Sequence, residues 1–461
     1  LELSVDSDFI DDYVLEVSTP GLDRKFFYSY QLNDFVGKTL KIKLKDKIND
    51  KKTFKYTSIV KVPDLSFFDH IYTGLDILEQ MDFQILKNKN IGIFCNHTAV
   101  NRNNTHLLDL IGKNKTINIK AIFEPEFGIW GVDDKRAKLI GSERVDPVSG
   151  AKIFNLLKRS LYPPDWILKE LDLIVIDIQD TGSRYSTFIA SITKLFESAS
   201  KHKIPVIILD RPNPIGGVKI EGPLPRTNFQ SFEAYHLLPI RHGMTIGEIL
   251  LMVNEMGWAK DLMRVELSII PIVNWERNQY LDETGLPWKK PVPYINDINS
   301  LVMFSGMDLL RGTNLNVGFG TESPYLIFGS PWLASGFFKE KLDMLNLPGV
   351  SFEEIEYRPK GSMYYNRVAK YNGRSCSGIK INVIDKNLVK PLETATSIIT
   401  LIERLHPREF QWAAHGYIDK LFGSNQLRLF VAQKKPPSYL SPQYMHDEIE
   451  FSKFRNKFLL Y

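Results

Sequence analysis

Four short runs of apolar residues constrain the fold of this chain more than any other feature of the sequence. Each run is bounded by polar residues, which is typical of a parallel strand that is buried on both faces. Helical patterns lie between the runs, so the strands are expected to form βαβ units. The runs are NIGIFCN from Asn90, INIKAIF (117–123), LDLIVIDI (171–178) and IPVIILD (204–210).

The segments between these strands predict helices at residues 104–110, 151–170 and 186–201, the second of which is split by Pro163 and Pro164. The third is amphipathic, with its large apolar residues on one side. The sequence therefore predicts the α/β class with a Rossmann-like parallel sheet. No GxGxxG follows the first strand, so a dinucleotide site is not indicated.

The second half of the chain is less regular and predicts a smaller mixed α/β domain. Thr245 is expected to cap a helix at residues 241–256, with Glu248 at its third position as a capping box. We expect a Rossmann-like domain at residues 70–250 and the mixed domain at residues 251–461. Further expected elements are strands at 264–272 and 376–385, a glycine-rich ordered binding loop at 304–332 and a helix at 392–404.

Composition narrows the class of protein. The length of 461 residues exceeds one ordinary domain, and no run of about 18 apolar residues predicts a transmembrane helix. The only cysteines, Cys95 and Cys376, cannot form a disulfide framework or a four-thiolate zinc site, and the histidines are not clustered, so no metal is expected. A net charge of +4 does not favour nucleic acid as a partner.

Polar side chains gather where each predicted strand ends. In an open α/β sheet the carboxyl ends of the strands form the ligand crevice. Loops after strands are polar in most α/β proteins, but Gln179, Asp180 and Arg184 are larger than a turn requires, which favours a functional site. The polar residues at or past the strand ends are Asn96, His97, Glu124, Glu126, Asp177, Gln179, Asp180, Asp210, Arg211 and Asn213.

The first part of the chain predicts a small β unit, because YVLEVS and TLKIKLKDK alternate at period two around turn residues. DYVLEVSTPGLDRKF and FVGKTLKIKL resemble the domain junction and first barrel strand of the ribosome maturation factor P (RimP) family. Residues 1–60 are therefore expected to be a RimP-like remnant. An incomplete barrel leaves open sheet edges, so we interpret its lysines as a solvated face. The ribosome is kept only as an alternative partner.

Residues from about 72 to 461 resemble the exo-β-N-acetylmuramidase family (NamZ) through an ordered series of motifs. The motifs include CNHTAVNR, IFEPEFGIWG, DIQDTGSRYSTF, LDRPNPIGG, LPIRHGMTIGE, DETGLPW, GTNLNVGFGT and IFGSPW. The resemblance implies a Rossmann-like domain beside a smaller domain with a barrel-like sheet, and an active site between them. It also implies release of N-acetylmuramic acid from the non-reducing end of peptidoglycan fragments, without a cofactor. The family suggests a periplasmic or extracellular location, although the visible start carries no signal-peptide pattern.

Glycoside hydrolysis requires an acid for the leaving oxygen and usually a second carboxylate. Glu126 matches the catalytic glutamate that the resemblance implies, and we expect it to be the general acid. Apolar neighbours would raise the pKa of Glu126 by desolvating its charged form. Asp180 is the first choice for the second group, ahead of Asp177 and Glu221.

Muramic acid carries a lactyl carboxylate, which an arginine can bind as a fork. Arg184 is the preferred candidate, with Arg211 and Arg241 as others, and Arg211 is nearly as well explained by a structural ion pair. Asp177 could orient Arg184 or bind loop amides. The other expected substrate-binding residues are His242 for a hydroxyl or a proton, and the amides Asn96, Gln179, Asn213 and Asn314.

Several residues depart from the family pattern near the expected cleft. Aromatic side chains replace a histidine at Phe127 and an arginine at Phe319, and Arg311 replaces an acid. These changes motivate an alternative function, a cell-wall saccharide binder without catalysis. The other departures are Trp130, Ser186 and Phe188.

Overall fold

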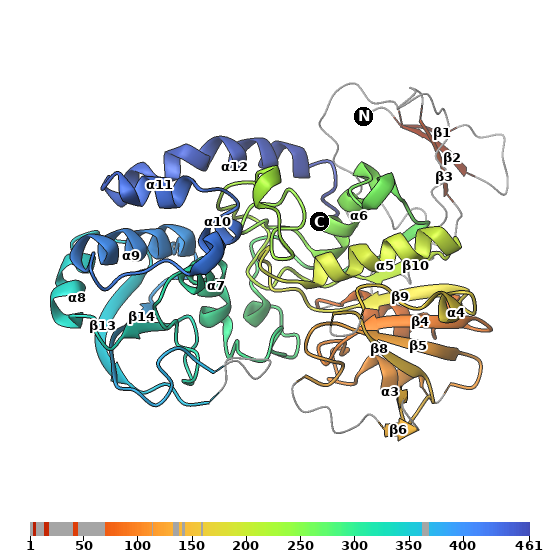
Figure 1. Cartoon of the computed structure of the whole chain (residues 1–461). Helices are drawn as coiled ribbons and strands as arrows, with labels where there is room; N and C mark the ends of the chain where they lie inside the picture. Colours follow the sequence, from red (N-terminus) through yellow and green to blue (C-terminus); the bar gives the residue numbers. More distant parts are fainter. Residues whose placement is uncertain are drawn as a thin grey trace.

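The computed structural model describes most of the chain from residue 70 onward (Figure 1). The residues that it describes are 3–5, 13–17, 40–44, 70–112, 114–131, 138–140, 143–157, 160–361 and 368–461.

The expected strands of the first part coincide with β2 (Tyr13–Val17) and β3 (Leu40–Leu44), which pair in parallel, while β1 (Leu3–Val5) pairs antiparallel with β2. The PGLDR loop and the FVGK segment lie outside the described residues. The RimP-like assignment therefore stays a prediction.

An eight-stranded, mostly parallel sheet forms the larger part of the molecule. Its last two strands, β7 and β6, run antiparallel to their neighbours, and every other pair is parallel. In spatial order the strands are β11 (Leu267–Ile270), β10 (Val206–Leu209), β9 (Leu173–Asp177), β4 (Asn90–Cys95), β5 (Asn118–Glu124), β8 (Lys152–Asn155), β7 (Glu143–Val145) and β6 (Lys138–Ile140).

Helices cover both faces of this sheet, which explains the continuous apolar runs. In β9, Leu173 and Val175 pack into the core on the side of α2 (Gly74–Gln80) and α3 (Leu107–Ile111). Ile174 and Ile176 belong to the core on the other face, together with apolar residues of α5 and α6. Successive strand residues alternate between faces, so a strand covered on both sides must be apolar throughout. These two helices are α5 (Phe188–His202) and α6 (Ile246–Met256).

The order of the strands places a crevice between β4 and β9. The chain runs from β4 to β5 on one side, whereas β9 lies on the other side of β4. Cys95 pairs with Asp177, so both strands end at the same level of the sheet. Ligands bind at such a reversal point, beyond the carboxyl ends of the strands.

The second half of the chain builds a smaller antiparallel sheet in the order β12-β14-β13. Its strands are β12 (Ile327–Ser330), β13 (Val350–Tyr357) and β14 (Cys376–Val383). The helices of this half are α7 (Ile298–Met307), α8 (Ser335–Asp343), α9 (Pro391–Leu405), α10 (Tyr417–Phe422), α11 (Gln426–Ala432) and α12 (Ser441–Arg455).

Helix α12 ties the end of the chain to the loops that follow the large sheet. Arg455 donates to the carbonyl oxygens of His242 and Gly243, and Glu448 accepts from the amide of Gly222. Figure 1 shows α12 reaching from the smaller sheet toward α6. The C-terminal segment is thus part of the packing between the two halves.

Two expected elements are wrong. Residues 151–170 form strand β8 and the short helix α4 (Asp165–Leu168) instead of a split helix, because residues 152–155 pair with β5. The expected loop at 304–332 contains the end of α7, the 3₁₀ helix η7 (Asp308–Gly312) and β12. The remaining short 3₁₀ helices are η3 (Gln84–Leu86), η4 (Thr227–Phe229), η5 (Lys260–Leu262), η6 (Leu281–Glu283), η8 (Ala414–Gly416) and η9 (Pro437–Tyr439).

The other expected elements from Asn90 onward form within a few residues of their predicted limits. The capping box of α6 is confirmed, since Thr245 accepts from the amide of Glu248 and Glu248 accepts from the amide of Thr245. The large sheet includes β11, which follows the expected domain boundary at residue 250.

Candidate active site

A buried ion pair lies at the carboxyl ends of β9 and β10. Arg211 Nε and Nη2 donate to the two carboxylate oxygens of Asp177 at 2.5 and 2.9 Å, and Nη2 also donates to the carbonyl of Val100 at 3.0 Å. Both side chains are buried. Burial raises the pKa of Asp177 despite the nearby guanidinium. Asp177 therefore pairs with Arg211 and not, as the sequence suggested, with Arg184.

Thr98 connects the ends of β4 and β9. Its hydroxyl donates to Asn96 Oδ1 at 2.5 Å and accepts from the backbone amide of Gln179 at 2.9 Å. The side chain of Gln179 donates to the carbonyls of Asp180 and Pro212. Asn96 Nδ2 is buried without a hydrogen-bond partner. The structure thus brings Asn96 and Gln179 together through a threonine.

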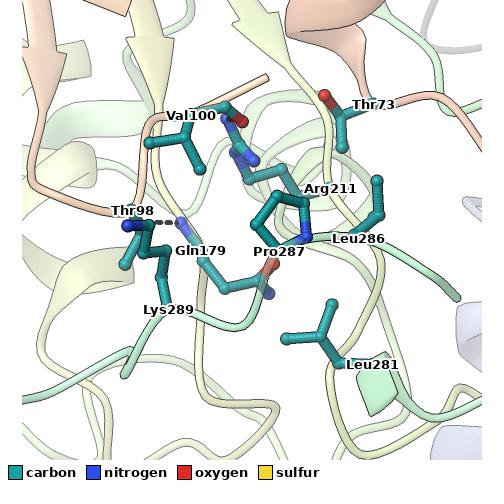
Figure 2. A pocket seen from close by; sticks show the side chains of 9 residues that line it. All are labelled: Thr73, Thr98, Val100, Gln179, Arg211, Leu281, Leu286, Pro287 and Lys289. Carbon is teal, nitrogen blue, oxygen red and sulfur yellow. Dashed lines mark hydrogen bonds between the residues drawn. The ribbon is translucent and has the colours of Figure 1, made fainter. Parts of the chain in front are cut away.

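A narrow pocket opens beside this group (Figure 2). Gln179 and Arg211 reach it from the strand ends and face Pro287 and Lys289 of a later loop. Its volume of about 10 Å³ is room for about one water molecule. The pocket can offer polar groups to a ligand at its mouth but does not enclose a sugar ring.

Asp180 and His242 form a second buried pair beneath these loops. Asp180 Oδ2 accepts from the amide of Gly182 at 2.9 Å and lies 3.7 Å from His242 Nε2. His242 Nδ1 accepts from the amide of Met244, so a neutral imidazole carries its proton on Nε2. Asp180 Oδ1 and His242 Nε2 are both buried without a hydrogen-bond partner. Each member of the pair thus has one polar atom that is available for a hydrogen bond to another group.

Glu126 lies two residues after the end of β5 and is only partly buried. Its Oε2 accepts from the hydroxyl of Thr187 at 2.9 Å, and Thr187 is the N-cap residue of α5. The rigid end of a sheet strand and the start of a long helix therefore position this carboxylate. It is more exposed than Asp180, which makes it easier for a ligand to reach.

Glu124, at the end of β5, organises the loop that carries Glu126. Its carboxylate accepts from Arg144, from Asn155 Nδ2 at 3.1 Å and from the amide of Ile129 at 3.3 Å. The buried side chain thus fastens the loop, through Ile129, to the neighbouring strands β7 and β8.

Arg184 is buried among backbone carbonyls. Its Nη1 donates to Pro223 and Leu238, and its Nη2 donates to Leu421 and Phe422 at the end of α10. The distances are 2.6 to 2.9 Å. This geometry joins the two halves of the chain, and it favours a structural role over binding of an external carboxylate.

Arg241 and Asn213 also hold loops past the strand ends. Arg241 donates to Glu221 Oε1 at 3.1 Å and to the carbonyl of Ile215. Asn213 Nδ2 donates to the carbonyl of Met244 at 2.9 Å. Both side chains are buried, so their polar groups are used inside the protein.

Asn314 belongs to a different region. Its side chain donates to the carbonyl of Glu409 and accepts from the amide of Gln411, which fastens the loop after α9. Its amide group is thus used within the smaller half of the molecule.

An aromatic group joins Glu126's loop to the second half. Tyr294 packs against Phe127 at 5.9 Å and against Phe319 at 5.4 Å between ring centroids. Phe319 also packs against Tyr325, whose hydroxyl donates to Asp308 at 2.9 Å. Two residues that depart from the family pattern, Phe127 and Phe319, therefore contact the same tyrosine.

Arg311, another departure, is held in a charged network. It donates to Asp308 at 2.9 Å and to the hydroxyl of Tyr417 at 2.5 Å, and its guanidinium lies 4.0 Å from Glu233. The carboxylates of Asp308 and Glu233 thus compensate the positive charge that Arg311 brings to a position where the resemblance implies an acid.

Two features of the wider molecule bear on the chemistry. Among the residues that the structure describes, no three His, Cys, Asp or Glu side chains gather as metal ligands. In the same part of the chain, none of the helices combines the length and apolar character needed to cross a bilayer.

Two protein-family models match successive parts of the chain. The N-terminal model of Exo-beta-N-acetylmuramidase NamZ matches residues 91–299, and the C-terminal model matches residues 302–461. Both describe an exo-acting muramidase, which is a class of glycoside hydrolase. The two matches span most of the chain, so it belongs to the exo-β-N-acetylmuramidase NamZ family. The RimP-like segment lies outside both matches.

Individual relatives agree with this assignment. Peptidoglycan beta-N-acetylmuramidase NamZ of Bacillus subtilis is 32% identical over 391 residues, which cover 85% of this chain and 91% of that protein. Crystal structures of two DUF1343 family proteins from Bacteroides fragilis have TM-scores of 0.77 and 0.68. Each is 25% identical and covers 85% of this chain and 99% of the crystallised chain.

Two residues that organise the site were not predicted from the sequence. Thr98 joins two strand ends, and Thr187 binds the Glu126 carboxylate. Both lie within the quoted motifs. A hydroxyl residue just past a strand or at a helix start was the available signal, since such residues bind exposed backbone and carboxylate groups.

Proposed function

We propose that this chain is a glycoside hydrolase that releases N-acetylmuramic acid from the non-reducing end of peptidoglycan fragments. The observation that carries the proposal is the match of both halves to the NamZ models, with the partly exposed Glu126 at a strand end in the first half. The family assignment does not favour the alternatives of a saccharide binder without catalysis or a ribosome-assembly role.

Glu126 is the proposed general acid. Glycosidic cleavage passes through an oxocarbenium-like state and requires protonation of the leaving oxygen. The hydrogen bond from Thr187 fixes one carboxyl oxygen of Glu126 at 2.9 Å and so orients the carboxyl group. Pre-orientation of this kind keeps the acid within reach of the oxygen that it must protonate.

Asp180 remains the proposed second carboxylate. Its Oδ1 is unsatisfied, and His242 Nε2 lies 3.7 Å from its Oδ2. In this proposal the Asp180 carboxylate stabilises the positive charge that develops at the anomeric carbon, and His242 lies beside it. Both groups are buried, so the proposal requires that substrate binding expose Asp180.

Substrate recognition is proposed for groups at the strand ends. Asn96 and Gln179 are candidates for the hydroxyl and acetamido groups, together with Asn213, and Asn314 is a more distant candidate. The arginines Arg184, Arg211 and Arg241 remain candidates for the lactyl carboxylate. Their internal acceptors, described above, favour structural roles for all three. Asp177 would then act through Arg211.

Finer features of the fold are also proposed. The parallel strands follow the order 3-2-1-4-5-6 when numbered along the chain from β4, which supports a Rossmann-like description. The division at residues 70–250 and 251–461 and the barrel-like character of the smaller sheet are proposals of the same kind.

The test uses a disaccharide of N-acetylmuramic acid and N-acetylglucosamine, with chromatographic detection of released N-acetylmuramic acid. Glu126→Gln should turn over about 10²–10⁴-fold more slowly than wild type. Glu340→Gln, a matched change on the exposed face of α8, should keep the wild-type rate. Equal turnover by wild type and Glu126→Gln would remove the assignment.

A further inference from the structure

A second hollow lies on the face of the large sheet that α5 and α6 cover. It runs between α5, residues 230–237 and the segment after α6, with a volume of about 560 Å³. That size is within the range of small-molecule sites, about 300–1,000 Å³. We call this hollow the α5 groove. None of the residues that line it also lines the pocket of Figure 2.

Aromatic rings form one wall of the α5 groove. Phe232 lies 6.2 Å from Tyr235, Tyr235 lies 4.9 Å from His236, and His236 stacks on Trp258 at 5.6 Å, measured between ring centroids. Trp258 also stacks on Phe454 of α12, at 6.2 Å between ring centroids. Each ring is supported by the next, so the wall keeps its shape without a ligand.

The charge of the α5 groove is positive. None of its lining residues is acidic, and Lys194 and Lys260 lie along it. Lys194 Nζ contacts the buried carboxylate of Glu197 at 2.9 Å and lies 5.0 Å from the Tyr235 ring centroid. Lys260 is exposed. Lys194 is thus largely compensated inside the protein, whereas Lys260 presents its charge to solvent.

The remaining polar groups of the α5 groove are neutral. Burial, with the charge of Lys194, lowers the pKa of His236 to about 3, so its imidazole is uncharged at neutral pH. Gln230 and Ser231 add an amide and a hydroxyl at the rim. The groove therefore offers ring faces and edges, neutral hydrogen-bonding groups and an exposed ammonium.

We infer that the α5 groove is a second glycan-binding site, which holds a carboxylate-bearing saccharide of the same peptidoglycan strand away from the bond being cut. Aromatic rings pack against the apolar faces of sugar rings, and ammonium groups form strong hydrogen bonds with carboxylates. The inference rests on the proposed function for the identity of the glycan. It assigns Lys260 and Phe232 to polymer binding and not to catalysis.

The test measures binding to insoluble peptidoglycan by sedimentation, in a Glu126→Gln background that prevents digestion. Lys260→Glu and Phe232→Ala should each weaken binding about tenfold. Lys420→Glu, a matched charge reversal on the exposed face of α10, should bind as the parent does. Unchanged binding by both groove variants would overturn the inference.

Two further readings separate the possible outcomes. In the active background, the groove variants should keep kcat/KM on the soluble disaccharide within about twofold of wild type, because neither residue lines the pocket at the strand ends; a parallel loss there would also overturn the inference. If the proposed catalysis fails, the sedimentation result still reports on the groove.

Competition experiments identify the group that the groove recognises. Competition by glycan without stem peptides, but not by N-acetylglucosamine oligomers, identifies the lactyl carboxylate. Competition only by fragments that carry stem peptides identifies the peptide carboxylates. Equal competition by N-acetylglucosamine oligomers would contradict carboxylate recognition.

Discussion

Replacing Arg211 with methionine tests whether the buried ion pair organises the strand ends. Methionine keeps most of the length of the side chain but removes the three hydrogen bonds to Asp177 and Val100. Asp177 is fully buried and would be left as an uncompensated charge. Breaking a buried pair by removing one partner costs about 3–5 kcal/mol.

The loss should depend on pH, with a sign that the structure determines. Burial already raises the pKa of Asp177, and loss of the guanidinium would raise it further. When the pKa of a carboxyl group is higher in the folded than in the unfolded state, the fold loses stability as pH rises from the unfolded-state pKa to the folded-state pKa. The stability deficit of Arg211→Met should therefore be smaller at pH 5 than at pH 8.

Urea unfolding followed by tryptophan fluorescence measures this deficit at the two pH values. The double variant Arg211→Met/Asp177→Asn should recover most of the loss, and its deficit relative to wild type should change less between the two pH values, because neither of the two positions carries a charge. A deficit that is equal at both pH values, or a double variant less stable than Arg211→Met by the full cost of Asp177→Asn, would refute this explanation.

Three other changes have outcomes that follow from single contacts. Thr245→Ala removes the cap of α6 and a hydrogen bond of 2.7 Å to Asp210, so unfolding free energy should fall by about 1–2 kcal/mol, whereas Thr245→Ser should keep most of it. Gly306→Ala would place a Cβ 2.0 Å from the carbonyl oxygen of Pro391, and urea unfolding should report a loss at the upper end of about 1–3 kcal/mol. Burial raises the pKa of Glu448 to about 7, so the wild type should lose stability as pH rises from about 4.3 to 7. Thermal unfolding of Glu448→Gln should show a weaker decline over that interval, and an unchanged decline would count against the raised pKa.

Burial made the large sheet predictable. The strands of its centre are covered on both faces, so residues such as Leu173 and Ile174 must both be apolar although they point in opposite directions. The cap of α6 was predictable for a local reason, since Thr245 and Glu248 bind each other's backbone within one helical turn. In both cases the determining interactions lie close in sequence or repeat along it.

Elements that depend on distant partners were not predictable in this way. Lys152 and its neighbours form a strand because β5 supplies their hydrogen bonds, and nothing in KIFN alone requires it. Arg184 lies four residues before the start of α5, but its acceptors lie up to 238 residues away, at Phe422. The sequence placed these polar residues at the strand ends correctly. It could not show which of their donors and acceptors form hydrogen bonds within the protein.

The departures from the family pattern have a structural explanation that the sequence lacked. Phe127 and Phe319 stand far apart in the chain, at positions where the resemblance leads us to expect polar residues, yet both pack on Tyr294. Arg311 replaces an acid but is compensated by Asp308 and Glu233. Each change is accommodated by its neighbours, so the fold around Glu126 is retained.

The claim that Glu126 protonates the leaving oxygen is tested most directly by turnover of two muramic acid glycosides. One carries an activated leaving group that departs without a proton, and the other carries an alkyl leaving group that requires one. For Glu126→Gln, the account predicts a loss of about 10²–10⁴-fold on the alkyl glycoside and a much smaller loss on the activated one. Equal losses on both glycosides, or no loss on either, would contradict the assignment of Glu126 as the acid.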